Sequence, residues 1–183
     1  HRVQGLQRAV KEKNNARLNQ IVFGNWDEKR AFQLSTKLIH RYADLHMIWC
    51  SSDLMALGAQ RAINNSNQHI ITGGFDWTSN AITSIQSGQL TASVGGPFTN
   101  AGFGMVLLYD YLHGKDFADV ASSTIKTKGA LIHKSNVDKY APFLLEKDWG
   151  SVDFKKYSRI YHPENKGYNF SLDYLLGNSK AIN

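Results

Sequence analysis

The strongest constraint on the fold is a repeated alternation of short apolar runs with longer segments of helical periodicity. Residues 18–23 form an apolar run rich in β-branched side chains, and apolar residues then recur on one helical face between Ala31 and Tyr42. The same order repeats along the chain, with strands expected at 46–50, 69–75 and 90–94 and helices at 53–64 and 79–87. This alternation predicts βαβ units and an α/β fold, a parallel sheet with helices on both faces.

The remaining chain is less regular. A helix is expected at residues 101–113, a strand at 129–133 and a helix at 136–145. Residues 150–183 have weak periodicity, so we expect an irregular extension that packs on the surface through aromatic side chains: Tyr157, Tyr161, Tyr168, Phe170 and Tyr174. A helix is also expected at residues 1–10. The predicted sheet would need a strand before this helix, so the chain is expected to begin just after a missing strand.

Composition excludes several classes of function. The 183 residues are 42% hydrophobic and 20% charged, as in ordinary globular proteins, and no apolar run approaches the ~20 residues of a membrane-spanning helix. The net charge of +6 comes from cations scattered among acids, which does not indicate a nucleic-acid partner. The single cysteine, Cys50, sits in an apolar run and is expected to be buried. The histidines lack metal-ligand spacing, so neither a metal nor a cofactor is predicted.

Polar and aromatic residues follow each expected strand, where loops into helices meet at one edge of a parallel sheet. These loops read Asn25-Trp26-Asp27, Ser51-Ser52-Asp53, Asp76-Trp77-Thr78 and Gly95-Gly96-Pro97. Carboxylates and arginine bind paired hydroxyls, and a tryptophan face packs against the C–H face of a pyranose. The combination is typical of a sugar site.

Each of these residues also has a purely structural interpretation. Asp53 and Asp76 both precede an expected helix and could serve as its amino-terminal cap. Trp26 and Trp77 could pack on the surface, and Arg2 could be a solvated side chain near a chain end.

Four phrases carry a family resemblance: R-V-Q-G-L at 2–6, C-S-S-D-L-M-A-L-G-A at 50–59, G-G-F-D at 73–76 and I-Q-S-G-Q-L-T-A-S-V at 85–94. Their order and spacing resemble the second lobe of type 1 periplasmic sugar-binding proteins, the group of ribose-binding protein, over roughly residues 1–145. The ligand domains of LacI-type repressors share the pattern.

The resemblance implies a role for individual residues. Arg2 corresponds to an arginine that grips sugar hydroxyls, Trp26 to an aromatic that stacks on the ring, and Asp76 to a carboxylate that accepts from ring hydroxyls. The family's Asn-Asp pair is here Ser52-Asp53, and a hinge glutamine is replaced by Gly96. The predicted ligand-binding residues are Arg2, Trp26, Ser52, Asp53, Asp76 and Trp77, with no catalytic residue.

The resemblance also implies a domain organisation. Residues 1–96 would form the Rossmann-like ligand-binding domain of the second lobe, and residues 97–127 a hinge crossing with a helix and strand of the first lobe. Residues 128–149 would form a return segment and a helix, and residues 150–183 the irregular extension. Most of the first lobe, which would close over the ligand by hinge motion, is then missing from this chain.

The implied function is that of the substrate-binding component of a bacterial ABC-type sugar transporter, periplasmic, with a small sugar as ligand and a membrane permease as partner. Two alternatives stay open: a periplasmic module that reports to a membrane sensor protein, and the ligand domain of a LacI-type regulator. A Rossmann enzyme is disfavoured because Gly73-Gly74 and Gly95-Gly96 do not stand in G-x-G-x-x-G context.

Overall fold

A computed structural model describes residues 2–13, 16–96, 99–120, 125, 129–146, 150 and 152–175. The chain divides into two compact units, His1–Ser93 and Val94–Asn183. The assignment of residues on either side of Gly96 to two lobes stays a prediction, and Pro97 of the expected crossing lies outside the described residues.

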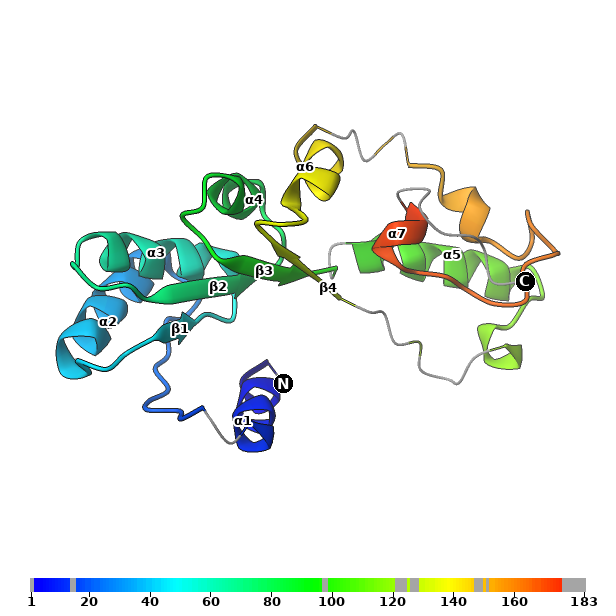
Figure 1. Cartoon of the computed structure of the whole chain (residues 1–183). Coiled ribbons are helices and arrows are strands. Elements are labelled where there is room, and N and C mark those ends of the chain that lie inside the picture. The colour runs from blue at the N-terminus through cyan, green and yellow to red at the C-terminus, as the bar shows by residue number, and fades with distance from the viewer. Residues whose placement is uncertain are drawn as a thin grey trace. The chain divides into compact units, whose positions relative to one another are not determined.

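The first unit alternates helices with strands, as the sequence predicts (Figure 1). Its elements are α1 (Arg2–Glu12), α2 (Glu28–Arg41), β1 (Met47–Trp49), α3 (Asp53–Asn64), β2 (Ile71–Phe75), α4 (Ser79–Gln86) and the start of β3 (Ala92–Gly95). In Figure 1, α3 and α4 lie on one side of the strands and α1 on the other. The predicted α/β class is confirmed.

The sheet has the strand order β1-β2-β3-β4, and β4 spans Ala130–His133. Strands β1 and β2 are parallel, with Met47 opposite Ile71 and Trp49 opposite Gly73. Such parallel pairing through an intervening helix is the βαβ arrangement expected from the alternation.

Local sequence explains how α2 and α3 form and pack. Asp27 caps α2 by accepting a hydrogen bond from the Arg30 amide, and Ser52 caps α3 by accepting from the Met55 amide. The buried face of α3 includes three small side chains: Ala56, Ala59 and Ala62. At Gly58 a Cβ atom would clash with the carbonyl of Glu28, so glycine lets the two helices approach closely.

One expected strand is wrong. Residues 18–23 do not form a strand, although their β-branched composition favours one. A strand needs a hydrogen-bonded neighbour as well as propensity, and in the described residues this run has none.

The second unit packs aromatic residues of the carboxyl-terminal extension against one helix. Its further elements are α5 (Asn100–Leu112), η2 (Phe117–Asp119), α6 (Val137–Glu146), η4 (Phe154–Tyr157) and α7 (Leu172–Leu175). Phe103 of α5 stacks on Phe170 with ring centroids 4.4 Å apart and meets the edge of Tyr157 at 5.2 Å. Tyr161 stacks on Tyr109 at 5.6 Å.

A buried carboxylate fixes this extension to α5. Asp110 has no exposed surface, and it accepts hydrogen bonds from the Ser158 hydroxyl, the Arg159 amide at 2.7 Å and the Tyr168 hydroxyl at 2.9 Å. Burial, together with the bond to Asp110, raises the pKa of Tyr168 to about 12. The described part of the extension is therefore held to the unit by specific bonds as well as by aromatic packing.

Across the described residues, no helix combines the length and apolar character needed to cross a bilayer. The same residues contain no group of three or more potential metal ligands among His, Cys, Asp and Glu.

Candidate sugar-binding site

The side chain of Arg2 lies at the carboxyl ends of β1 and β2. One of its terminal nitrogens donates to the Ser51 carbonyl, directly after β1, and the other donates to Asp76 Oδ1 at 3.2 Å, directly after β2. The Arg2 and Asp76 side chains remain 31% and 37% exposed. An arginine and a carboxylate that are fixed by each other yet partly open to solvent can bind the hydroxyls of a polar ligand.

Two aromatic faces flank this ion pair. The guanidinium carbon of Arg2 lies 3.8 Å from the ring centroid of Phe75 and 5.5 Å from that of Trp26. These are cation–π distances, and they orient the planar guanidinium. The Trp26 side chain is 60% exposed, so much of its surface is open to a ligand.

Phe75 is absent from the residues predicted from sequence, yet it contacts Arg2 more closely than Trp26 does. Strand alternation could have identified it. A Cβ atom on Gly74 would lie 2.8 Å from the Asp53 Cα atom and 3.0 Å from the Ala56 side chain, so position 74 faces α3. Position 75 therefore faces the opposite side of the sheet, where Arg2 lies.

The backbone is unusual at both loops that carry the site. Positive φ angles occur at Asn25 (53°), Trp26 (61°), Asp76 (131°) and Trp77 (62°). Such conformations cost on the order of 1–3 kcal/mol for a non-glycine residue and concentrate at functional sites. Glycine would adopt them at less cost, so the larger side chains at these positions carry a conformational penalty.

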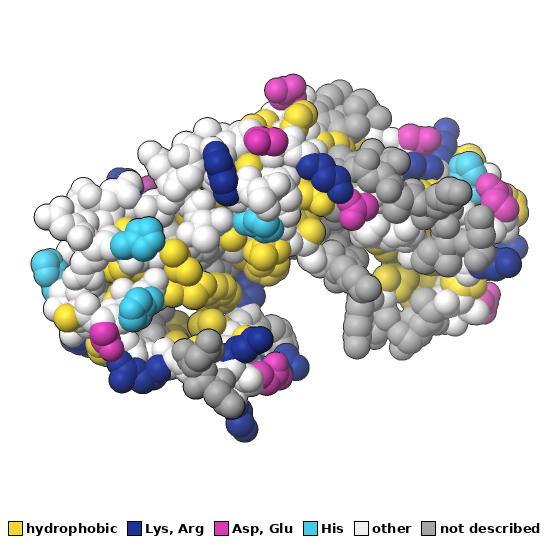
Figure 2. Space-filling view, viewed as in Figure 1, with side chains coloured by type: hydrophobic (Ala, Val, Ile, Leu, Met, Phe, Trp, Pro, Cys, Tyr) yellow, Lys and Arg dark blue, Asp and Glu magenta, His cyan; other side chains and the backbone are white. Residues whose placement is uncertain are grey.

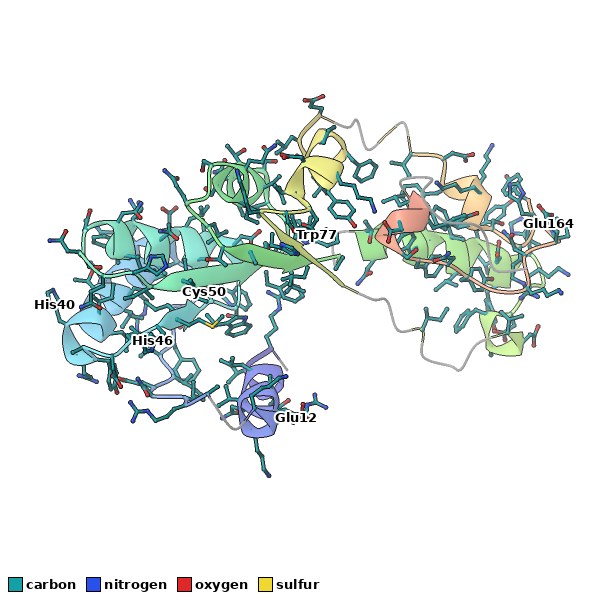
Figure 3. All side chains as sticks on the ribbon, viewed as in Figure 1. Glu12, His40, His46, Cys50, Trp77 and Glu164 are labelled. Carbon is teal, nitrogen blue, oxygen red and sulfur yellow. The ribbon has the colours of Figure 1, made fainter. Side chains whose placement is uncertain are left out.

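Three of the predicted site residues have little exposed surface: Ser52, Asp53 and Trp77 are 4%, 0% and 5% exposed. Their direct contact with a ligand stays a prediction. The Ser52 hydroxyl caps α3, and the Trp77 indole nitrogen donates to the Ser93 carbonyl at 3.3 Å. Figure 3 labels Trp77 beyond the end of β2. The interpretation of Trp77 as surface packing is wrong, because its side chain is buried.

Asp53 is buried and forms hydrogen bonds that hold the loop next to the site. It does not cap α3, since that position belongs to Ser52. One carboxylate oxygen accepts from the Ser93 hydroxyl at 2.6 Å, and the other accepts from the Thr78 amide at 2.8 Å. Burial raises the pKa of Asp53, and these hydrogen bonds partly oppose the rise. The carboxylate thus joins α3 to β3 and to the loop that carries Asp76.

The alternative interpretation of Asp76 as a helix cap is also wrong. The cap position of α4 is Thr78, and no side chain makes a capping bond there. The Asp76 carboxylate is instead engaged by Arg2 and partly exposed. Arg2, Trp26 and Asp76 are therefore the predicted residues that the structure brings together, and Phe75 joins them.

Cys50 lies next to this site at the end of β1 (Figure 3) and is 9% exposed, as expected. Burial raises the pKa of its thiol to about 12, and a hydrogen bond with Thr72 lowers it by a smaller amount. The thiol is therefore neutral near pH 7 and packs as a small apolar side chain.

Comparison with known proteins gives a consistent result. A family model described as "Periplasmic binding protein domain" matches residues 1–116. The chain is 30% identical over 103 residues to the ribose import binding protein RbsB of Bacillus subtilis strain 168, which covers 56% of this chain and 34% of that protein. It is 27% identical over 92 residues to the D-allose-binding periplasmic protein of Escherichia coli K12, covering 49% and 30%.

Solved structures show the same fold. A periplasmic sugar-binding protein from Pseudomonas fluorescens superposes with a TM-score of 0.84 at 27% identity, covering 96% of this chain and 55% of that one. A periplasmic solute-binding protein of an ABC transporter from Actinobacillus succinogenes 130z, solved with D-allose, superposes with a TM-score of 0.68 at 17% identity, covering 76% and 49%. The chain thus spans about half the length of these solved proteins and about a third of the curated relatives. The resemblance found in the sequence is confirmed, and the chain belongs to the periplasmic binding protein domain family.

Proposed function

We propose that this chain supplies one side of the sugar site in the substrate-binding component of a bacterial ABC-type sugar transporter. The observation that carries the proposal is the partly exposed Arg2–Asp76 pair with Trp26 and Phe75 beside it, at the carboxyl ends of parallel strands. Charged groups suit the hydroxyls of a sugar and aromatic faces suit its C–H surface. The names of the curated relatives, which refer to ribose and allose, support a small aldose as ligand.

The proposal extends to the whole protein. The first lobe, most of which this chain does not span, would cover the ligand from the other side, and the closed form would dock on a membrane permease from the periplasm. The protein binds and releases its ligand unchanged, and none of the residues at the site is assigned a catalytic role. An experiment in cells distinguishes the transporter role from the sensor role. If the protein serves a transporter, loss of its gene lowers uptake of labelled sugar. If it serves a sensor, loss of its gene abolishes only a sugar-induced response.

Trp26 tests this proposal. Partial burial of an indole against a sugar contributes at most a few kcal/mol, at ~25 cal/mol per Å² over an aromatic surface of ~150–250 Å². Because a ring face packs on C–H groups without reading individual hydroxyls, Trp26→Ala in the full-length protein is expected to weaken binding of every aldose by similar factors. Calorimetric titration with D-ribose and D-allose measures this effect.

Trp26→Phe is the matched control and should retain most of the affinity, because it keeps an aromatic face. A loss in the alanine variant that is confined to one sugar would contradict the stacking role. Unchanged affinity for both sugars would remove Trp26 from the site.

A further inference from the structure

The buried carboxylate of Asp53 links the ends of three neighbouring strands. Asp53 begins α3 after β1, and its Oδ1 atom accepts from the Ser93 hydroxyl of β3 at 2.6 Å. Its Oδ2 atom accepts from the amide of Thr78, after β2, at 2.8 Å and from the Thr78 hydroxyl at 3.3 Å. Because β2 lies between β1 and β3, this side chain crosses the end of β2. A Cβ atom at Gly74 of β2 would clash with the Asp53 carboxylate, so glycine at this position leaves room for the crossing.

Ser93 holds the same turn from β3. The Trp77 amide donates to the Ser93 hydroxyl oxygen at 3.4 Å, and the Trp77 indole nitrogen donates to the Ser93 carbonyl at 3.3 Å. The two amides that follow Asp76 are therefore bound by Ser93 and Asp53. Asp53 and Ser93 are both 0% exposed, whereas the acidic side chains visible in Figure 2 lie at the surface.

The turn that this buried pair holds has an unfavourable backbone conformation. Asp76 and Trp77 have positive φ angles, which residues other than glycine adopt at a cost and keep only where the surrounding structure fixes them. Arg2 binds the side chain of Asp76, whereas Asp53 and Ser93 bind the backbone directly after it. The direction in which the Asp76 carboxylate points therefore depends on the buried pair.

We propose that Asp53 and Ser93 set the sugar affinity of the site by holding the Asp76 carboxylate in its binding position. Both are positioning residues, because they act through Asp76 and need not touch the sugar themselves. This role rests on the proposed function, in which Asp76 accepts hydrogen bonds from sugar hydroxyls. When a binding site adopts its competent conformation for only a fraction of the time, the apparent affinity falls by that fraction.

Ser93→Ala in the full-length protein tests the pair. The substitution removes the hydroxyl that donates to Asp53 and accepts from Trp77, and it adds no volume to the core. We expect the affinity for D-ribose or D-allose, measured by calorimetric titration, to fall about tenfold, as the turn would leave its binding conformation for about nine-tenths of the time. Hydrogen exchange at the Trp77 and Thr78 amides should become faster in the ligand-free variant.

Thr72→Val is the matched control. Thr72 of β2 is also buried, and its hydroxyl donates to the Ile48 carbonyl of β1 at 2.7 Å. Valine keeps the branched shape and removes the hydrogen bond, so the melting temperature should fall as it does in Ser93→Ala. The sugar affinity should stay within about twofold of that of the unmodified protein. A loss of affinity that follows the melting temperature in both variants would overturn the proposal, since it would reflect general destabilisation.

A double-mutant cycle separates action through Asp76 from any other effect of Ser93 on sugar binding. With Asp76→Asn already in place, Ser93→Ala should weaken binding by less than about twofold, because the contact through which Ser93 acts is already altered. Equal losses of affinity in the two backgrounds would overturn the positioning role.

Asp53→Asn provides a second variant for the case in which Ser93→Ala folds poorly. It keeps an oxygen for the Thr78 amide but replaces the acceptor of the Ser93 hydroxyl with a donor, so it should show the same loss of affinity and the same dependence on Asp76. Unchanged sugar affinity in a folded variant would overturn this proposal and leave the proposed function intact. Failure of the unmodified protein to bind either sugar, or normal binding by Asp76→Asn, would overturn the proposed function of Asp76 and the positioning role with it.

Discussion

Replacing Asp76 with Asn in the full-length protein is expected to weaken sugar binding by tenfold or more while leaving the melting temperature nearly unchanged. The variant keeps the side-chain shape but turns half of an acceptor pair into a donor, and a charge-assisted hydrogen bond to a ligand contributes about 1.5–3 kcal/mol. A tenfold loss corresponds to about 1.4 kcal/mol. The ion pair with Arg2 is more than one-third exposed on the Asp76 side, so its own contribution to stability is about 0–1 kcal/mol.

The matched control is Asp44→Asn. Asp44 also pairs with an arginine, Arg17 at 2.8 Å, but both side chains are well exposed and this ion pair includes neither Arg2 nor Asp76. Its substitution should change neither sugar affinity nor melting temperature appreciably. Calorimetric titration and thermal melting on the same preparations give both quantities. Unchanged affinity of the Asp76 variant would remove this carboxylate from the site.

Replacing Asp110 with Ala is expected to destabilise the second unit by about 1–3 kcal/mol or more, because its hydrogen-bond donors lose their acceptor. The carboxylate is fully buried and accepts three hydrogen bonds, from Ser158, Arg159 and Tyr168. Its removal leaves the buried Ser158 hydroxyl and the partly buried Arg159 amide and Tyr168 hydroxyl without this acceptor. Each buried group left unpaired costs about 1–3 kcal/mol unless water reaches it. Urea denaturation, together with hydrogen exchange at the Arg159 amide, measures the effect.

Asp119→Ala is the control for this substitution. Asp119 lies nine positions further along in the same unit and is exposed, so its loss should change stability by less than about 0.5 kcal/mol. In the Asp110 variant the Arg159 amide should exchange much faster, because it loses its acceptor. If that amide keeps its protection, the extension is held by aromatic packing alone and the role assigned to Asp110 is wrong.

The regular elements could be predicted from sequence because periodicity reports directly on which face of a segment is buried. The strands at 46–50 and 69–75 and the helix at 53–64 were expected within one or two residues of β1, β2 and α3. Residues 18–23 carry an equally clear strand signal and form no strand. Composition indicates only a tendency to form a strand. A strand also needs a hydrogen-bonded neighbouring strand, and the sequence of the segment does not show whether one is present.

The site could be predicted in part for a similar reason. Asp53 and Asp76 both follow an apolar strand and precede a helix, so local sequence gives them the same interpretation. The difference arises from contacts distant in sequence: Ser93 and Thr78 engage Asp53 inside the fold, and Arg2 engages Asp76 at its surface. The burial of Trp77 against β3 also arises from a contact distant in sequence, so the sequence of its own loop does not predict it.

The central claim is that Arg2, Trp26, Phe75 and Asp76 form one side of a sugar site, and titration of the full-length protein with D-ribose and D-allose tests it most directly. Calorimetry should show saturable binding of at least one of these sugars, one molecule per chain, with a dissociation constant in the micromolar range or below. That binding should be weakened at least tenfold by Arg2→Ala, because the substitution removes the cation that organises the site. Absence of saturable binding for both sugars, or equal affinity in the Arg2 variant, would contradict the account.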